Sequence, residues 1–68
     1  MTTNEIKFDE YLRANGYVLE FAAIEAMQAS NGEDEYFMGK AEGLCIALAQ
    51  VSGVNLDWVR DHICEKAF

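Results

Sequence analysis

Proline is absent from the 68 residues, so the chain lacks the residue that most strongly interrupts helices. Long apolar runs are missing as well: the longest covers residues 44–49, whereas a membrane-spanning helix needs about 20 apolar residues. The first residues lack the basic start and the apolar stretch of a secretion signal. We therefore expect a cytoplasmic protein that has no membrane partner.

Basic residues are scarce, because only 5 lysines and arginines stand against 12 aspartates and glutamates, which gives a net charge of −7. A field of this sign repels phosphate and anionic lipid, which argues against nucleic acid as a partner. It favours a partner protein with a basic surface. The same charge also keeps a small protein soluble by self-repulsion, and this simpler role stays open beside the binding role.

The sequence does not contain the residues of a known catalytic, metal-binding or phosphate-binding motif at the spacing that the motif requires. The only histidine, His62, is two positions from Cys64 on one predicted helix, so the two side chains point in different directions. A di-metal Glu-x-x-His motif is absent, because Val59 stands three residues before His62. Gly39 and Gly43 lack the strand and the Lys-Ser/Thr pair of a phosphate-binding loop. We predict no catalytic residue, no metal, no cofactor and no enzymatic activity.

Polar interruptions at residues 15–16, 30–32 and 52–55 divide the chain into segments with helical spacing of apolar residues. The chain is thus predicted to be all-α, a small three- or four-helix bundle in a single domain over residues 1–68. Residues 1–14 are only weakly amphipathic and are expected to dock most loosely, although Thr2 and Glu5 match a capping box. The predicted helices are about 4–14, 17–29, 33–51 and 56–66.

The third predicted helix has the clearest pattern. Ser30 and Glu33 match a capping box, and Glu33, Asp34 and Glu35 place three carboxylates at the positive end of the helix dipole. That gives the acidic cluster a structural role, and as part of the acidic N-terminal half it is also a candidate contact for a partner. The apolar residues at 3–4 spacing predict a core stripe of Phe37, Ala41, Leu44, Leu48 and Val51.

A second row on the same predicted helix contains the small residues Gly39, Gly43 and Ala47 at intervals of four. A glycine inside a helix costs roughly 1 kcal/mol relative to alanine. The row therefore predicts that another helix approaches closely, either from the same chain or from a second copy. The second option is an alternative function, a self-assembling structural protein that forms a homodimer through this row.

The fourth predicted helix follows Asn55, a favourable N-cap residue. Its buried stripe is predicted to contain Leu56, Val59 and Ile63. Its acidic residues recur at intervals of four and form a ridge, while the single tryptophan lies on a different face. Together with the cluster at 33–35, the candidate partner-binding residues are Glu33, Asp34, Glu35, Asp57, Trp58, Asp61 and Glu65.

Residues 45–64 resemble a helix-turn-helix of the repressor type. A small residue, Ala49, stands four before Gly53, and the apolar Val54 and Val59 follow the glycine at one and six positions. The resemblance implies a DNA-binding regulator, which is a second alternative function. The acidic ridge opposes this reading, because helices that read DNA present cations and amides to it.

The stretch Tyr36-x-x-Gly39-x-x-x-Gly43-Leu44-x-x-Ala47-Leu48-x-x-Val51-Ser52-Gly53, with the small size and the acidity, resembles small acidic helical proteins of bacteriophage and prophage genomes. Many such proteins bind a host protein, and some inhibit defence systems. The resemblance implies a phage-encoded inhibitor or modulator of a host protein that acts in the host cytoplasm. Mimicry of nucleic acid by the carboxylates is one form of this hypothesis.

The two cysteines test how the last two helices pack. The midpoint of Cys45 and Cys64 falls in the turn at residues 52–55. An antiparallel hairpin would bring the thiols level with each other, and a steep crossing would separate them. We expect a loose hairpin in which both thiols are reduced.

Overall fold

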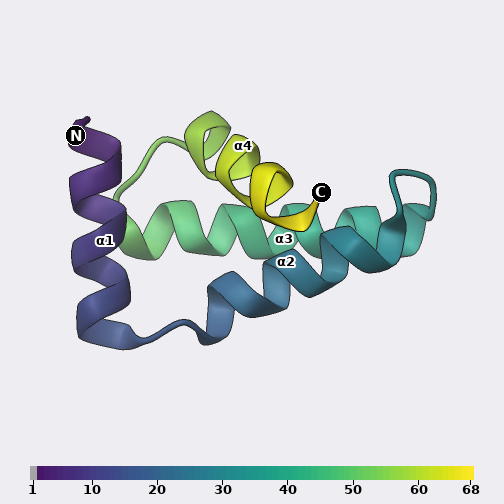
Figure 1. The fold of residues 1–68 in the computed structure, drawn as a ribbon, viewed down its shortest axis with the longest axis horizontal. Coiled ribbons are helices and arrows are strands. Elements are labelled where there is room, and N and C mark those ends of the chain that lie inside the picture. The colour runs from purple at the N-terminus through teal and green to yellow at the C-terminus, as the bar shows by residue number, and fades with distance from the viewer. Residues whose placement is uncertain (1) are drawn as a thin grey trace.

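The computed structural model describes residues 2–68, and this part of the chain forms four α-helices and no strand. They are α1 (Thr3–Asn15), α2 (Val18–Ser30), α3 (Glu35–Ser52) and α4 (Leu56–Ala67). Figure 1 shows α2 and α3 running in opposite directions along the long axis, α4 slanting back over them, and α1 lying across one end. The prediction of a small all-α bundle is confirmed, with four helices.

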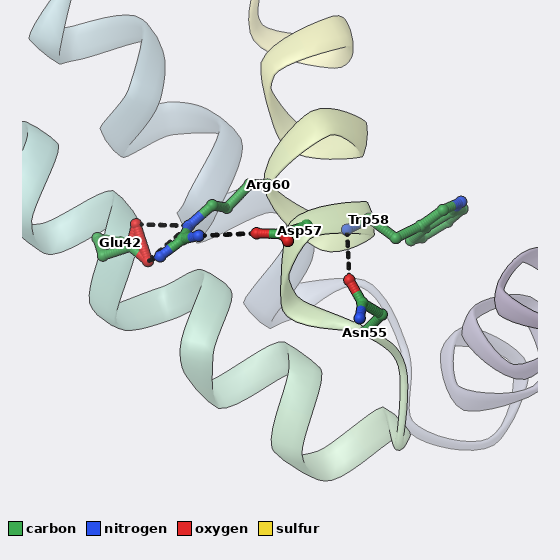
Figure 2. Close-up of polar contacts among 5 residues, drawn as sticks. All are labelled: Glu42, Asn55, Asp57, Trp58 and Arg60. Carbon is green, nitrogen blue, oxygen red and sulfur yellow. Dashed lines mark hydrogen bonds and ion pairs between the residues drawn. The ribbon is translucent and has the colours of Figure 1, made fainter.

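Most helix ends lie at the residues that the sequence indicated. Gly16 and Gly53 follow α1 and α3 with φ of 85° and 72°, a region that glycine enters without steric cost. At the start of α1, the Glu5 amide donates to Thr2 Oγ1 at 3.2 Å. At the start of α4, the Trp58 amide donates to Asn55 Oδ1 at 3.2 Å (Figure 2). Local capping chemistry therefore defines these boundaries.

The predicted capping box of Ser30 and Glu33 is wrong. Ser30 is the last residue of α2, and its hydroxyl donates to the Met27 carbonyl at 2.6 Å. Asp34 is the N-cap of α3 instead, because its carboxylate accepts hydrogen bonds from the amides of Tyr36 and Phe37 at 2.9 and 3.2 Å. The helix consequently begins at Glu35, two residues later than predicted.

One apolar core joins all four helices. α2 packs against α3 and α4, and α1 packs against α3. α1 contributes a single buried residue to the core, so this helix is held mainly by one side chain. The buried core cluster comprises Phe8, Ala23, Cys45, Leu48, Val54, Val59 and Ile63.

The predicted core stripe of α3 is correct in part. Ala41 and Leu48 are fully buried, but Cys45 lies between them and Val51 is 57% exposed. At about 100° per residue, Val51 lies roughly a quarter turn from the buried line of Ala41, Cys45 and Leu48. The predicted stripe therefore deviates toward the exposed side of α3 at its C-terminal end.

The two cysteines are free, and they differ in environment: Cys45 is buried and Cys64 is exposed. An alkylating reagent at neutral pH is expected to modify Cys64 alone, because the thiolate is the reactive form. Burial, followed by the charges of Glu42 and Cys64, raises the pKa of Cys45 to about 11. Mass spectrometry should find one label on the folded chain and two after unfolding. Equal labelling of both thiols in the folded chain would contradict the packing of Cys45.

The same shift makes stability depend on alkaline pH. The pKa of Cys45 in the folded chain lies above its ordinary value of 9.0, so folding favours the protonated thiol. This contribution to stability is complete below about pH 9 and is lost as the pH rises through about 11. Denaturant unfolding measures this effect. Between about pH 9 and pH 11, the free energy of unfolding should fall less for Cys45→Ala than for the parent chain.

Candidate binding groove

A groove of about 680 Å³ separates α1 from α2 and α4. Its volume lies within the range of about 300–1,000 Å³ that is typical of ligand pockets. The groove lies where α1 crosses the end of the bundle (Figure 1), and Phe8 of α1 reaches α4 through its contacts with Trp58 and His62. Its lining divides into an aromatic wall, a buried polar pair and an acidic rim.

The aromatic wall is formed by three rings from α1 and α4. Trp58 and His62 are stacked, with centroids 5.0 Å apart and planes inclined by 12°. Phe8 packs against both, at centroid distances of 5.3 Å to Trp58 and 4.8 Å to His62. Trp58 and His62 meet because they are one helical turn apart on α4. Phe8 therefore anchors α1 on this part of α4.

The buried polar pair joins α2 to α4. Glu20 Oε2 lies 2.9 Å from His62 Nε2, with 4% of the Glu20 side chain and 20% of the His62 side chain exposed. The distance suits an Nε2–H that donates to the carboxylate. A carboxylate is rarely buried without a partner, because desolvation of its charge is costly. The imidazole compensates that cost and ties the two helices together next to the groove.

The acidic rim comes from two helices that face each other. α1 contributes Glu5 and Asp9, and α4 contributes Asp61 and Glu65. Among residues 2–68, Lys66 is the one lysine or arginine that lines the groove. Asp9 also forms an exposed ion pair with Arg13 at 3.0 Å. A concave site lined by charges of one sign concentrates the electrostatic field and attracts cations. The rim therefore gives this groove a negative potential.

The structure separates the predicted partner-binding residues into three regions, of which the third contains Asp57. Trp58, Asp61 and Glu65 line the groove. The exposed cluster Glu33, Asp34 and Glu35 lies at the turn between α2 and α3, at the end of the bundle opposite α1 (Figure 1). These residues do not form one surface with the groove.

Asp57 and Arg60 form a separate polar cluster with Glu42, as Figure 2 shows. Arg60 Nε donates to both carboxylate oxygens of Glu42 at 2.8 and 2.9 Å, and Nη2 donates to Oε1 at 2.6 Å. Its Nη1 donates to Asp57 Oδ1 at 3.0 Å. The hydrogen bonds that Arg60 donates to Glu42 are the main cause of a raised pKa for Arg60. The guanidinium of Arg60 is thus engaged by two carboxylates of its own chain.

That arrangement bears on the helix-turn-helix resemblance. Gly53 is in the left-handed conformation, and Val54 and Val59 are buried, as the resemblance implies. The helix in the position of the recognition helix, α4, has only Arg60 and Lys66 as basic residues. With Arg60 held by Glu42 and Asp57, α4 presents mainly carboxylates, which phosphate repels.

The row of small residues on α3 lies on the outside of the bundle. Gly39 and Gly43 are exposed, and a Cβ atom at either would meet nothing within 4 Å among residues 2–68. Ala47 is half-buried. The option that a helix of the same chain packs closely on this row is therefore wrong. A second copy remains as the other option.

Sequence reasoning missed Glu20, Phe8 and the role of His62 in the groove. One local signal was present for Glu20, which is a charged residue in the otherwise apolar stretch 17–24. Its partner was not visible, because the Glu20–His62 contact joins residues 42 positions apart. Glu5 and Asp9 have ordinary positions on an amphipathic helix, so nothing in the sequence marked them as part of a site.

Potential metal ligands do not gather in groups of three or more within residues 2–68. In the same range, no helix is both long enough and apolar enough to span a membrane. Comparison with known protein families, curated proteins and solved structures finds no match to the chain.

Proposed function

We propose that the chain is a non-enzymatic module that binds a basic segment of another protein in the groove between α1 and α4. The observation that carries the proposal is the convergence of rim carboxylates from two helices, Glu5 and Asp9 on one side and Asp61 and Glu65 on the other. A basic segment that lies between the two helices would neutralise both sides at once. Trp58 adds an aromatic surface for the apolar part of that segment.

The acidity and the small helical fold also lead us to propose a biological setting, a phage-encoded inhibitor or modulator of a host protein in the host cytoplasm. In the mimicry form of this proposal, the carboxylates occupy a groove on the host protein that normally binds nucleic acid. Duplex DNA should then compete with the chain for the host protein, while showing no binding to the chain alone.

The single tryptophan makes the proposal testable without a label. Titration with a short lysine- and arginine-rich peptide should change the fluorescence of Trp58, and the affinity should fall steeply with added salt. The double variant Asp61→Lys, Glu65→Lys should lose about tenfold or more in affinity, since two attractions become repulsions. Glu33→Lys, Glu35→Lys makes the same change in net charge at the other end of the bundle and is the matched control.

The outcomes separate the alternatives. Equal losses for both double variants would indicate a general charge effect, and a larger loss for the control would place the site at the α2–α3 turn. The absence of any salt-dependent binding at low ionic strength would refute the proposed function.

A second candidate function is self-assembly through the outer face of α3. The exposed residues of this face are Tyr36, Gly39, Lys40, Gly43, Ile46 and Gln50, and none of them is acidic. In a chain with a net charge of −7, such a face is where two copies approach with least repulsion. The glycines would allow the two backbones to come close.

Sedimentation of the purified chain tests this candidate. If it is correct, the parent chain is a dimer, and Gly43→Leu gives a folded monomer because leucine favours the helix but blocks the approach. Ala29→Leu, at an exposed position of α2, should leave the dimer intact. A monomeric parent chain, or a dimer that Gly43→Leu leaves unchanged, excludes the row as an interface.

A further inference from the structure

Glu20 is the one carboxylate of the groove that is almost completely removed from solvent. Its side chain is 4% exposed, yet it lines the groove together with the exposed carboxylates of the rim. Among residues 2–68 its carboxylate receives one side-chain hydrogen bond, from His62 to Oε2. A carboxylate offers about four acceptor sites on two oxygens. Oε1 is therefore available to a donor that enters from the groove.

The wall of the groove next to Glu20 is aromatic. His62, which holds Glu20, is stacked on Trp58, and Trp58 is only partly buried. Tyr17, on the same groove, is 52% exposed. Aromatic faces attract cations and pack well against planar groups. The aromatic wall thus adds a surface for a planar, positively charged group beside Glu20 and the acidic rim.

The chemistry of the lining decides between kinds of cation. The groove residues do not form a metal site, since within residues 2–68 no three potential ligands are arranged so that they could hold one metal ion. A guanidinium combines a planar face for Trp58 with donors for Glu20, and it is less strongly hydrated than an ammonium. Of the two basic side chains, arginine is consequently the one that enters a half-buried aromatic site at the lower desolvation cost.

We propose that the groove receives one arginine side chain of the basic partner segment, and that its guanidinium donates to Glu20 while it lies against Trp58. This inference rests on the proposed function and specifies its anchor. The rim carboxylates Asp61 and Glu65 attract the segment by charge, whereas Glu20 selects the residue that enters. Glu20 is a specificity-determining residue in this scheme.

Two peptides of equal charge test the selection on the wild-type chain. One is a short lysine- and glycine-containing peptide with a single central arginine, and in the other this arginine is replaced by lysine. The arginine peptide is expected to bind about tenfold more tightly, measured by Trp58 fluorescence, because a guanidinium suits both the aromatic wall and the carboxylate. Equal affinities would overturn the proposal, and this comparison requires no variant of the chain.

Glu20→Gln tests the same point from the protein side. The variant removes the charge while the amide can still contact His62, and circular dichroism establishes that it is folded. It should lose about tenfold in affinity for the arginine peptide and lose the preference for arginine over lysine. The matched control Glu65→Gln removes one rim charge and should weaken both peptides equally while the preference persists. An unchanged preference in folded Glu20→Gln would refute the role of Glu20.

Failure of this inference is distinguishable from failure of the proposed function. If both peptides bind with strong salt dependence and equal affinity, the proposal that the groove binds a basic segment is supported, and the proposal that Glu20 selects arginine is refuted. If neither peptide binds, both proposals are refuted. The third ligand to be tested is agmatine, a small molecule that carries a guanidinium. If agmatine bound as tightly as the arginine peptide, the ligand would be a small molecule, and the assignment to an arginine side chain of a partner would be overturned.

Discussion

Replacement of Leu48 by alanine is expected to destabilise the chain by about 2–5 kcal/mol, the range for large-to-small substitutions in a packed core. Leu48 has no exposed surface and belongs to the buried cluster that all four helices share. Since stability scales at about 0.05–0.15 kcal/mol per residue, the 68 residues provide only about 3–10 kcal/mol in total. If the total lies toward the lower end of this range, the substitution should leave a substantial fraction of the chains unfolded at room temperature.

Urea unfolding followed by circular dichroism measures this loss directly. Val51→Ala is the matched control, because Val51 lies on the same helix but is 57% exposed. Its effect should stay within about 0.5 kcal/mol, as for other surface positions. If the two variants had equal stability, Leu48 would not be the central core residue that the structure shows.

The elements that the sequence predicted correctly depend on neighbouring residues. Gly16 and Gly53 end helices through their own backbone conformations, and Asn55 caps α4 through an amide three residues away. Signals of this kind lie within one helical turn, so a pattern of residues contains them completely. The α2–α3 turn shows the limit: Ser30 and Asp34 could each cap α3, and only the observed hydrogen bonds decide for Asp34.

The groove could not be predicted in the same way, because its parts meet only through the packing of helices. The Glu20–His62 contact spans 42 positions, and the contact of Arg60 with Glu42 spans 18. Glu20 appeared as an isolated charge in an apolar stretch, and such a charge is buried only where a distant partner compensates it. The acidic ridge was visible as a pattern, but the position of α1 determines that Asp61 and Glu65 become one rim of a groove and Asp57 does not.

Phe8→Ala is expected to release α1 from the bundle while α2, α3 and α4 remain folded. Phe8 is the only buried residue of α1 and is 2% exposed. Truncation of a buried phenylalanine costs about 3–5 kcal/mol. The remaining contacts of α1 with the core come from Tyr11 and Leu12, which are only partly buried. Because the other core residues belong to α2, α3, α4 and the turn before α4, the loss should fall on the docking of α1.

Three measurements describe that state. Trp58 loses its contact with Phe8, so its fluorescence should shift to longer wavelength. Amide hydrogen exchange should become fast in α1 and stay slow in α3. The groove has one wall from α1, so binding of the basic peptide should also be lost. Ile6→Ala, at a residue of α1 that is 44% exposed, should change none of the three.

The result decides whether α1 is a separate unit of stability. If Phe8→Ala left the Trp58 emission and the exchange of α1 unchanged, other contacts would hold the helix, and Phe8 would not be its anchor. If the variant lost exchange protection in α3 as well, the destabilisation would have reached the core around Leu48 and Ile63. The four helices would then unfold as one cooperative unit. Selective loss in α1 would instead mean that the groove forms and opens with the docking of a single phenylalanine, so that the affinity for a basic partner is coupled to the stability of α1.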